Sequence, residues 1–279
     1  MEDARAESVT VQEPLDIIEA ELAGCLVLLV EDNETNQLVM SMQISTLGYT
    51  AIIASDGHEA LELWERHSFA LVLTDCSMPE MDGFELASAI RQAESSTGIH
   101  TPIVAVTANA DNSEITRCLN CGMDDCIFKP VDLDALRSVL EQWLSQPDSH
   151  ALITRTETVA SDRSEIRHAS TPVDPEVLNS LFEGDTAMHH RLLLKYRDTS
   201  PAIFNSMDRA VEEGDLASVV AAAHKIKSST RTIGAVQLAD LIQLMEDAGK
   251  LNESGKVTRL ASLIREEFDR VVHYINQLS

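Results

Sequence analysis

The sequence predicts a chain of mixed fold class, α/β plus all-α, in which a parallel (βα)5 sheet domain is followed by a four-helix bundle. Two observations carry this prediction. From Cys25 to Leu144, short apolar runs alternate five times with amphipathic segments, and from Pro175 onward the apolar residues keep a helical spacing. The length of 279 residues and the hydrophobic content of 44% are sufficient for two cores.

Five apolar runs predict the strands of the first domain. They are CLVLLV, TAIIA, ALVLTD, IVAVTA and CIFKP. Because these runs are nearly all apolar, the strands are expected to form a parallel sheet buried on both faces. The helices are predicted at NQLVMSMQISTLG, GHEALELWERH, DGFELASAIRQAE, SEITRCLNCG and LDALRSVLEQWL. The domain is expected to span residues 23–145, after an acidic N-terminal linker at residues 1–22.

Residues 146–172 are polar and framed by prolines, which predicts a flexible linker. A short helical segment, PEVLNSLF, and four long ones follow. Their short connections predict an antiparallel four-helix bundle over residues 173–279. Pro201 is expected to kink or interrupt the first long helix. Three glycines are expected at helix ends, namely Gly214, Gly234 and Gly249.

The charge is strongly negative and unevenly distributed. The formal net charge is −25, and residues 1–150 carry 6 Lys and Arg against 27 Asp and Glu. This balance argues against unaided binding of nucleic acid or anionic membrane through a basic surface. No apolar run approaches the roughly 18 residues of a membrane span, and the acidic N-terminus lacks a signal-peptide pattern. A cytoplasmic location is therefore expected.

The five cysteines lie in the first half of the chain, at positions 25, 76, 118, 121 and 126. Their odd number and the placement of two of them on predicted strands indicate reduced thiols in an intracellular protein. Cys118, Cys121 and Cys126 resemble part of a zinc site. No second Cys or His pair follows at a suitable spacing, so metal binding is not expected there.

Polar residues follow four of the predicted strands at their carboxyl ends, where ligands of open parallel sheets bind. Glu31 and Asp32 follow the first strand, Asp75 ends the third, Thr107 the fourth, and Lys129 follows the fifth. Each of these residues alone has an ordinary structural explanation. Their joint placement at one edge of a sheet predicts a site.

The chemistry expected at this edge is phosphoryl transfer with a metal. Three carboxylates cannot share a small pocket without a cation, and Mg²⁺ prefers oxygen ligands. Glu31 and Asp32 are expected to hold the metal while Asp75 acts as the nucleophile. Lys129 would pair with Asp75 before transfer and with the phosphoryl oxygens after it, and Thr107 would offer a hydroxyl to the same oxygens.

The segment AAAHKIKSSTRTIGA places a histidine on the polar side of a predicted helix. A helical wheel gives one mostly apolar stripe, formed by Leu216, Val219, Val220, Ala223, Ile226, Thr230 and Ile233. His224 lies outside this stripe, with Lys227, Ser228 and Arg231 on its side. We expect the imidazole to face outward among cations, which suits a neutral ring that receives a dianionic phosphoryl group. Taken alone, the segment also fits an ordinary solvated histidine.

VLLVEDNETNQ, LVLTDCSMPEMDGFEL, IVAVTANA and CGMDDCIFKP resemble the hallmark segments of two-component response-regulator receiver domains, over roughly residues 25–145. The resemblance implies a flavodoxin-like fold, with Asp75 as phospho-acceptor and Glu31, Asp32 and the Ser77 carbonyl as Mg²⁺ ligands. It also implies that Thr107 and Lys129 are the switch and charge-neutralising residues. Many receivers have Tyr or Phe where this chain has Cys126, so their aromatic switch is not expected here.

AHKIKSSTRTIGA is similar to the signature of histidine-phosphotransfer (HPt) domains, over about residues 173–279. By this resemblance His224 carries the phosphoryl group and Lys227 helps to neutralise it. Ser228 stands where the family usually has Gly. His189 and His190 are expected to be helix-surface or partly packed residues. No convergent partners are apparent for the remaining histidines, which are His58, His67, His100, His150, His168 and His273.

A receiver followed by an HPt domain resembles the C-terminal arrangement of unorthodox hybrid sensor histidine kinases of the Bvg/Evg virulence type. It implies a phosphorelay from a kinase phosphohistidine to Asp75, then to His224, then to an external response regulator. The kinase core would act in cis or in trans. This chain has no Gly-rich nucleotide-binding box and is not expected to bind ATP, which fits either a separate phosphotransfer protein or a fragment of a hybrid histidine kinase.

Three other functions compete with the forward relay. In a reverse relay the two sites would drain phosphate from a regulator to water, and the sequence leaves this direction open. A scaffold that is never phosphorylated is disfavoured by the complete set of acidic, Thr and Lys residues. A dehalogenase-like phosphatase would need a second Asp two residues after the nucleophile, and Ser77 occupies that position.

Overall fold

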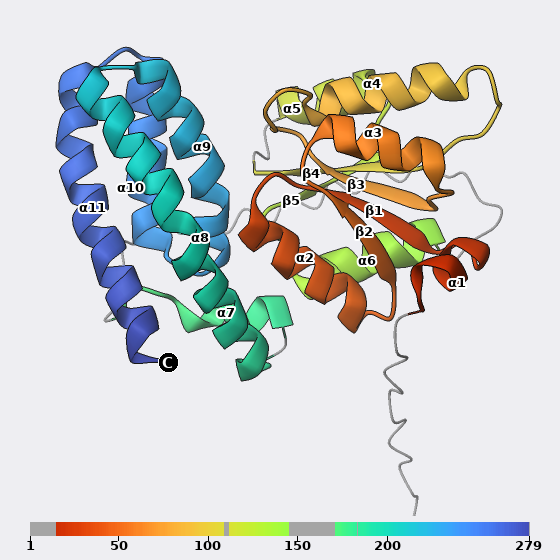
Figure 1. The fold of residues 1–279 in the computed structure, drawn as a ribbon, viewed down its shortest axis with the longest axis horizontal. Coiled ribbons are helices and arrows are strands. Elements are labelled where there is room, and N and C mark those ends of the chain that lie inside the picture. The colour runs from red at the N-terminus through yellow and green to blue at the C-terminus, as the bar shows by residue number, and fades with distance from the viewer. Residues whose placement is uncertain (1–14, 109–111, 145–170, 183, 279) are drawn as a thin grey trace, which may run out of the picture. The chain divides into compact units, whose positions relative to one another are not determined.

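The computed structural model describes residues 15–108, 112–144, 171–182 and 184–278 (Figure 1). The chain divides into two compact units, one ending at Trp143 and the other beginning at Leu144. Almost all of the predicted flexible linker lies outside the described residues, as do His150 and His168. Each unit is considered by itself below.

The first unit contains a sheet of five parallel strands, which confirms the predicted fold class. The strands are β1 (Leu26–Val30), β2 (Thr50–Ala54), β3 (Leu71–Asp75), β4 (Ile103–Thr107) and β5 (Asp125–Phe128). Their order across the sheet is β2-β1-β3-β4-β5. All residues of β1 and β4 are buried, because helices cover both faces of the sheet.

Helices follow the strands as the amphipathic segments predict. They are α2 (Glu34–Thr46), α3 (Gly57–Arg66), α4 (Gly83–Glu94), α5 (Asn112–Asn120) and α6 (Leu133–Leu144). α3, α4 and α5 lie on one face of the sheet, and α2 and α6 lie on the other (Figure 1). A short helix, α1 (Ile17–Leu22), precedes β1, begins at the capping side chain of Asp16, and buries Ala20 completely.

The strand order places the polar strand ends side by side. It reverses between β1 and β3, and ligands of doubly wound sheets bind at such a switch point. Val30 pairs with Thr74, so Glu31 and Asp75, which follow them, stand next to each other at the carboxyl edge. β4 and β5 continue the same edge.

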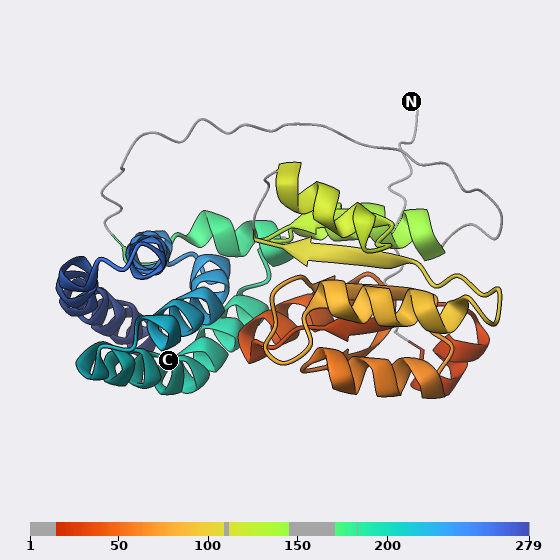
Figure 2. The same ribbon diagram turned by 90° about the horizontal axis from the view of Figure 1, so that it is seen from above.

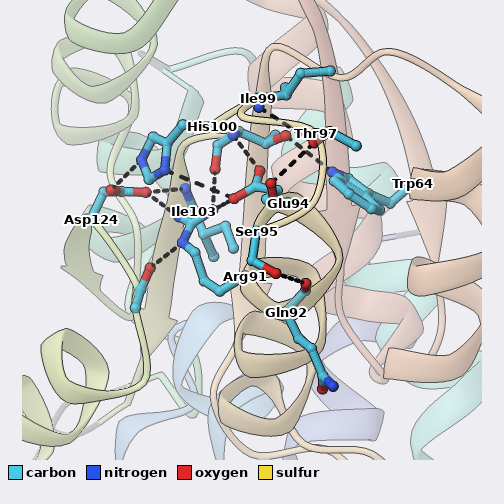
Figure 3. Close-up of polar contacts among 12 residues, drawn as sticks. Trp64, Arg91, Gln92, Glu94, Ser95, Thr97, Ile99, His100, Ile103 and Asp124 are labelled. Atoms are coloured by element: carbon cyan, nitrogen blue, oxygen red, sulfur yellow. Dashed lines mark hydrogen bonds and ion pairs between the residues drawn. The ribbon is translucent and has the colours of Figure 1, made fainter.

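A cluster of charged residues lies at the amino edge of the sheet, opposite the carboxyl edge (Figure 3). We call it the arginine cluster; it consists of Arg91, Glu94, His100 and Asp124. The guanidinium of Arg91 donates to Glu94 at 2.6 Å and to Asp124 at 2.7 Å, and it also donates to the carbonyls of Gly122 and Thr101. His100 Nε2 lies 2.8 Å from Asp124 Oδ1. The loops that lead into β4 and β5 are thus tied to the end of α4.

His100, for which the sequence shows no convergent partners, thus has carboxylate neighbours in the fold. Two other such histidines have one partner each: His67 Nδ1 lies 3.2 Å from a carboxylate oxygen of Glu21, and His273 Nε2 lies 2.9 Å from Gln277. These partners come from elements that are distant in the sequence or from the next helical turn. All three contacts are exposed or partly buried, and none of them lies at the carboxyl edge of the sheet.

The second unit is entirely helical in its described part. Its helices are α7 (Pro175–Phe182), α8 (Thr186–Glu213), α9 (Leu216–Thr232), α10 (Val236–Lys250) and α11 (Ser254–Gln277). α8 packs on α9, α9 on α10, α10 on α11, and α11 on α8, which closes a four-helix bundle. Figure 2 shows these helices, coloured from green-cyan to dark blue, packed side by side.

One expectation for the bundle needs correction. α8 continues through Pro201, so the proline does not interrupt the helix. The three glycines lie at helix ends as expected. Gly214 ends α8 with a φ of 71°, and Gly234 follows α9 with a φ of 80°. Gly249 is the penultimate residue of α10 and is buried against α9.

The apolar stripe predicted around His224 forms part of the bundle core. Val219, Ala223, Ile226 and Ile233 are at most 1% exposed. Deeper in the core, the hydroxyl of Tyr196 lies 2.8 Å from Thr230 Oγ1. None of the helices in the described part of the chain combines the length and the apolar character that a membrane span requires.

Candidate functional site

The loop after β1 is fixed by the start of α2. Asn33 caps this helix, because its side chain accepts the backbone N–H groups of Thr35 and Asn36. Glu31 Oε1 accepts from the Asn36 side chain at 3.0 Å and from the Asn33 N–H at 3.2 Å. The side chain of Gln37 donates to the Glu31 carbonyl at 2.6 Å. Glu31 is only 1% exposed, and these bonds hold its carboxylate in one orientation.

The loop after β3 is held by the start of α4. Asp75 Oδ1 accepts the N–H of Ser77 at 3.1 Å, and Ser77 itself is exposed. α4 starts with a reciprocal capping box between Asp82 and Glu85. A Cβ on Gly83 would lie 2.2 Å from the Asp75 carbonyl oxygen, so only glycine permits this close approach.

Three carboxylates and one ammonium group meet at the carboxyl edge of the sheet. Ligand oxygens of Glu31, Asp32 and Asp75 all lie within 4.8 Å of one another. Lys129 Nζ lies 2.5 Å from Glu31 Oε2 and 2.6 Å from Asp75 Oδ2. The Lys129 side chain is 7% exposed and that of Asp75 is 13% exposed, so Asp75 is the more accessible partner.

Burial and charge oppose each other in this cluster. Burial raises the pKa of Glu31 to about 7, although Lys129 counteracts part of that effect. Burial alone would lower the pKa of Lys129, but the charges of Asp75 and Glu31 outweigh it and raise that pKa. Lys129 therefore stays cationic and offsets part of the negative charge of the neighbouring carboxylates.

Thr107 lies at the end of β4 and is 2% exposed. Its hydroxyl donates to Glu114 Oε1, on the first turn of α5. Glu114 is a partner that the sequence analysis did not identify. The bond joins the carboxyl edge of the sheet to α5.

The donor set fits a hard divalent cation. Glu31, Asp32 and Asp75 offer carboxylate oxygens, and Mg²⁺ prefers such ligands while it keeps several waters. In the described residues these are the only three His, Cys, Asp or Glu side chains that converge closely enough to hold a metal ion. The cysteines at 118, 121 and 126 do not form such a group, and all five cysteines of the chain are free.

In the bundle, His224 lies on α9 and faces α10. Its side chain is 40% exposed, and its Nδ1 lies 3.1 Å from Glu246 Oε1. Glu246 is 1% exposed and also accepts from Lys227 at 2.7 Å and from Lys250 at 2.6 Å. Lys227 donates in addition to Gln243. One buried carboxylate thus organises a histidine and two lysines.

The expectation of purely cationic surroundings for His224 is therefore wrong. Burial disfavours the charged form of Glu246, but hydrogen bonds from His224, Lys227 and Lys250 outweigh it and hold the pKa of Glu246 well below its usual range. Arg231, also expected beside the histidine, pairs with Asp240. The imidazole accordingly borders an anion on one side and solvent on the other.

Close packing of α9 on α10 brings the histidine to its carboxylate. A Cβ on Gly249 would lie 2.5 Å from a methyl group of Val220. Val220 precedes His224 by one helical turn, and Gly249 follows Glu246 by three residues. A larger residue at position 249 would separate the helices close to the contact between His224 and Glu246.

Sequence reasoning missed Glu246, although a signal was present. The buried positions of α10 include Leu238, Ala239, Ile242 and Met245, and Glu246 falls on the same stripe. A glutamate within an apolar helical stripe needs a buried partner. The histidine motif on the neighbouring helix supplies that partner.

The family models identify both units. Residues 27–141 match the model described as the response regulator receiver domain, and residues 191–274 match that of the Hpt domain. The chain therefore contains a receiver domain followed by an Hpt domain, which are parts of two-component phosphorelay systems. The resemblance stated from the sequence motifs is confirmed.

The most similar relatives include hybrid sensor kinases that contain both parts. The virulence sensor protein BvgS of Bordetella pertussis is 31% identical over 242 residues, which are 86% of this chain and 19% of that protein. The sensor protein EvgS of Escherichia coli strain K12 is 30% identical over 220 residues, covering 79% of this chain and 17% of that protein. The chain thus spans about a fifth of the length of these relatives.

Solved structures also resemble the first unit. The receiver domain of a sensor histidine kinase from Pseudomonas aeruginosa, solved with a magnesium ion in its active-site cleft, is 36% identical, with a TM-score of 0.41. That match covers 44% of this chain and 99% of the receiver domain. A complex from Saccharomyces cerevisiae, of a histidine phosphotransfer protein and a receiver domain, contains a chain with 30% identity and a TM-score of 0.40. Here 42% of this chain and 87% of that chain are covered.

Proposed function

We propose that this chain is a two-step phosphorelay intermediate, in which Asp75 accepts a phosphoryl group from a kinase phosphohistidine and His224 accepts it from Asp75. A separate response regulator then receives the group from His224. The relay role follows from the two domains, whereas the residues and the direction of transfer belong to the proposal. The observation that carries it is the convergence of Asp75 with Glu31, Asp32 and Lys129 at the switch point of the sheet.

Each residue of the receiver site would have its own role in phosphoryl transfer. A carboxylate oxygen of Asp75 attacks phosphorus while the histidine nitrogen leaves. Glu31, Asp32, Asp75 and the Ser77 carbonyl would hold Mg²⁺, which when bound offsets the negative charge of the phosphoryl oxygens. Lys129 now bridges Asp75 and Glu31, and after transfer it would pair with a phosphoryl oxygen. Thr107 would exchange Glu114 for another phosphoryl oxygen.

The HPt residues would complete the transfer. Glu246 accepts from Nδ1 of His224, which leaves Nε2 as the ring nitrogen that attacks the phosphoryl group. Lys227 lies 2.7 Å from Glu246 and would neutralise charge on the transferred group. Ser228 is half-buried beside them, and its small side chain leaves the imidazole open to a docking domain.

The partners and the location follow from the same proposal. A histidine kinase core, in the same polypeptide or in another one, supplies the phosphoryl group, and a response regulator removes it. Both reactions take place in the cytoplasm, whether the chain acts alone or as the cytoplasmic part of an inner-membrane sensor. The strong net charge of the first half, 6 basic against 27 acidic residues, gives no basic surface for nucleic acid.

Labelling with acetyl phosphate tests the receiver step without a kinase. Wild-type chain with Mg²⁺ is expected to acquire phosphoryl label, which enters at Asp75 as a base-labile acyl phosphate before it passes to His224, because Asp75 is the accessible carboxylate beside Lys129. Asp75→Asn should remove it, whereas Asp134→Asn, at an exposed position on α6, should not. Equal labelling of wild type and Asp75→Asn would contradict the proposal, and failure of the wild type to label would favour a scaffold.

A further inference from the structure

Four of the five cysteines gather between the sheet and α5, on the side of the molecule that carries Thr107 and Glu114. Cys76 Sγ lies 3.8 Å from Cys118 Sγ, and both residues are 1% exposed. Cys121 and Cys126 are half-buried and pack against the same hydrophobic core. Cys25 also packs against this core, but it lies at the amino end of β1. The pair at 76 and 118 is thus a close contact of two thiols from distant parts of the chain.

The position of this pair connects it to the phospho-acceptor. Cys76 directly follows Asp75, whose β3 strand ends at the site. Cys118 lies on α5 four residues after Glu114, so both project from the same side of the helix. Glu114 accepts the hydroxyl of Thr107. A covalent bond between the two sulfurs would therefore tie α5 to the end of β3 in the arrangement that directs Thr107 toward Glu114.

We propose that Cys76 and Cys118 form a reversible disulfide when the protein is exposed to hydrogen peroxide, and that this cross-link slows phosphoryl transfer to Asp75. The second part rests on the proposed function, since it requires Thr107 to leave Glu114 for a phosphoryl oxygen. Disulfide formation must shorten the present sulfur contact of 3.8 Å to a bond length of about 2 Å. The site is a redox modification site, and the modifying agent is a two-electron hydroperoxide oxidant.

The reaction balances with peroxide as the oxidant. One thiol sulfur attacks the O–O bond and becomes a sulfenic acid, and one water leaves. The second sulfur then attacks this sulfenic sulfur, the S–S bond forms, and a second water leaves. Together the two thiols lose two electrons and two protons, and hydrogen peroxide is reduced to two waters. A dithiol such as dithiothreitol reverses the reaction by thiol–disulfide exchange.

The first measurement maps the bond itself. The full chain is treated with hydrogen peroxide, free thiols are alkylated, and peptides are analysed by mass spectrometry without reduction. A peptide pair joined through Cys76 and Cys118 is expected, and it should be absent from Cys118→Ala and still present in Cys25→Ala. Circular dichroism verifies that Cys118→Ala is folded. Failure of the wild type to form this pair, or preferential pairing of Cys118 with Cys121 or Cys126, would overturn the proposal.

The second measurement compares acetyl phosphate labelling of Asp75 in the reduced and the oxidised chain. Oxidation is expected to slow labelling by about fivefold or more, the lower range of couplings between two sites, and dithiothreitol should restore it. Cys118→Ala should label at the same rate before and after peroxide. A cross-linked chain that labels at the reduced rate would refute the regulatory effect. If the reduced chain itself does not label, the proposed function fails, while the peptide map still decides on the disulfide.

Discussion

At the scale of single residues, the two sites use buried carboxylates in opposite ways. Glu31 is crowded by other carboxylates, and burial raises its pKa to about 7. Glu246 is surrounded by three donors that hold its pKa well below the usual range. The first arrangement suits a pocket that takes up a cation, and the second suits a permanent anion that orients a histidine.

Replacement of Glu246 by Gln is expected to slow phosphoryl acceptance by His224. The amide keeps the shape of the side chain but loses the charge that favours a proton on Nδ1. A fall of about 10- to 100-fold is expected, as is typical when a carboxylate that orients a histidine is lost. The rate of transfer from phosphorylated receiver to the variant measures this. Glu266→Gln, at an exposed position on α11, is the matched control and should transfer normally.

The lowered pKa of Glu246 also predicts how stability depends on pH. Ionised Glu246 stabilises the bundle above the ordinary Glu pKa of about 4.3, and this stabilisation is lost as the pH falls through the lowered value. Hydrogen exchange of peptides from α9 and α10 measures opening of this region at pH 7 and at about pH 3, which lies below the ordinary Glu pKa. The difference in protection between wild type and Glu246→Gln should be larger at pH 7. An equal difference at both values would contradict the assignment.

At the scale of elements, the strands and helices could be predicted from the sequence, and the contacts between them could not. Five apolar runs correspond to the five strands; β1, β3 and β4 are buried nearly throughout, whereas β2 and β5 are only partly buried. Asp75, Glu31 and Lys129 could be brought together by topology alone. Glu246 and Glu114 were not predicted as site residues, because their partners lie on other elements. Helical spacing does not tell which elements face each other. The expected interruption at Pro201 was wrong, because α8 continues through this residue.

Gly83→Ala tests the close contact between the start of α4 and the end of β3. The new Cβ would lie 2.2 Å from the Asp75 carbonyl oxygen, so α4 must shift. A loss of about 1–3 kcal/mol in the free energy of unfolding of the first unit is expected. Gly255→Ala is the matched control, because its Cβ would meet open space at the start of α11. There the substitution should stabilise by up to about 1 kcal/mol. Urea unfolding measures the free energy of unfolding of each unit. A Gly83→Ala variant with unchanged stability would refute the contact.

Arg91→Ala tests the arginine cluster at the other edge of the sheet. The substitution removes bonds to two carboxylates and two carbonyls and leaves Glu94 buried without its cation. The expected loss is about 3 kcal/mol. Arg66→Ala removes an exposed pair with Glu62 on α3 and should cost less than about 1 kcal/mol. Fluorescence of Trp64, which bonds Thr101 beside the cluster, follows the unfolding. Equal effects of the two variants would show that the cluster contributes little.

At the scale of the whole molecule, the chain combines the two proposed phosphoryl acceptors, a carboxylate and an imidazole, in separate domains. Asp75 is 13% exposed and His224 is 40% exposed, so each remains accessible to a docking partner. The two domain families explain why these residues occur in one chain. The direction of flow between them depends on the relative stabilities of the acyl phosphate and the phosphohistidine, which transfer experiments measure.

Phosphoryl transfer from a phosphorylated kinase core, with Mg²⁺ present, tests the relay most directly. Wild type, Asp75→Asn and His224→Gln are compared, and each product is tested for acid-labile and base-labile phosphate. The relay predicts no label on Asp75→Asn, base-labile label alone on His224→Gln, and acid-labile label in the wild type. If His224→Gln changes neither the chemistry nor the lifetime of the label, His224 is not a relay station and the central claim is wrong.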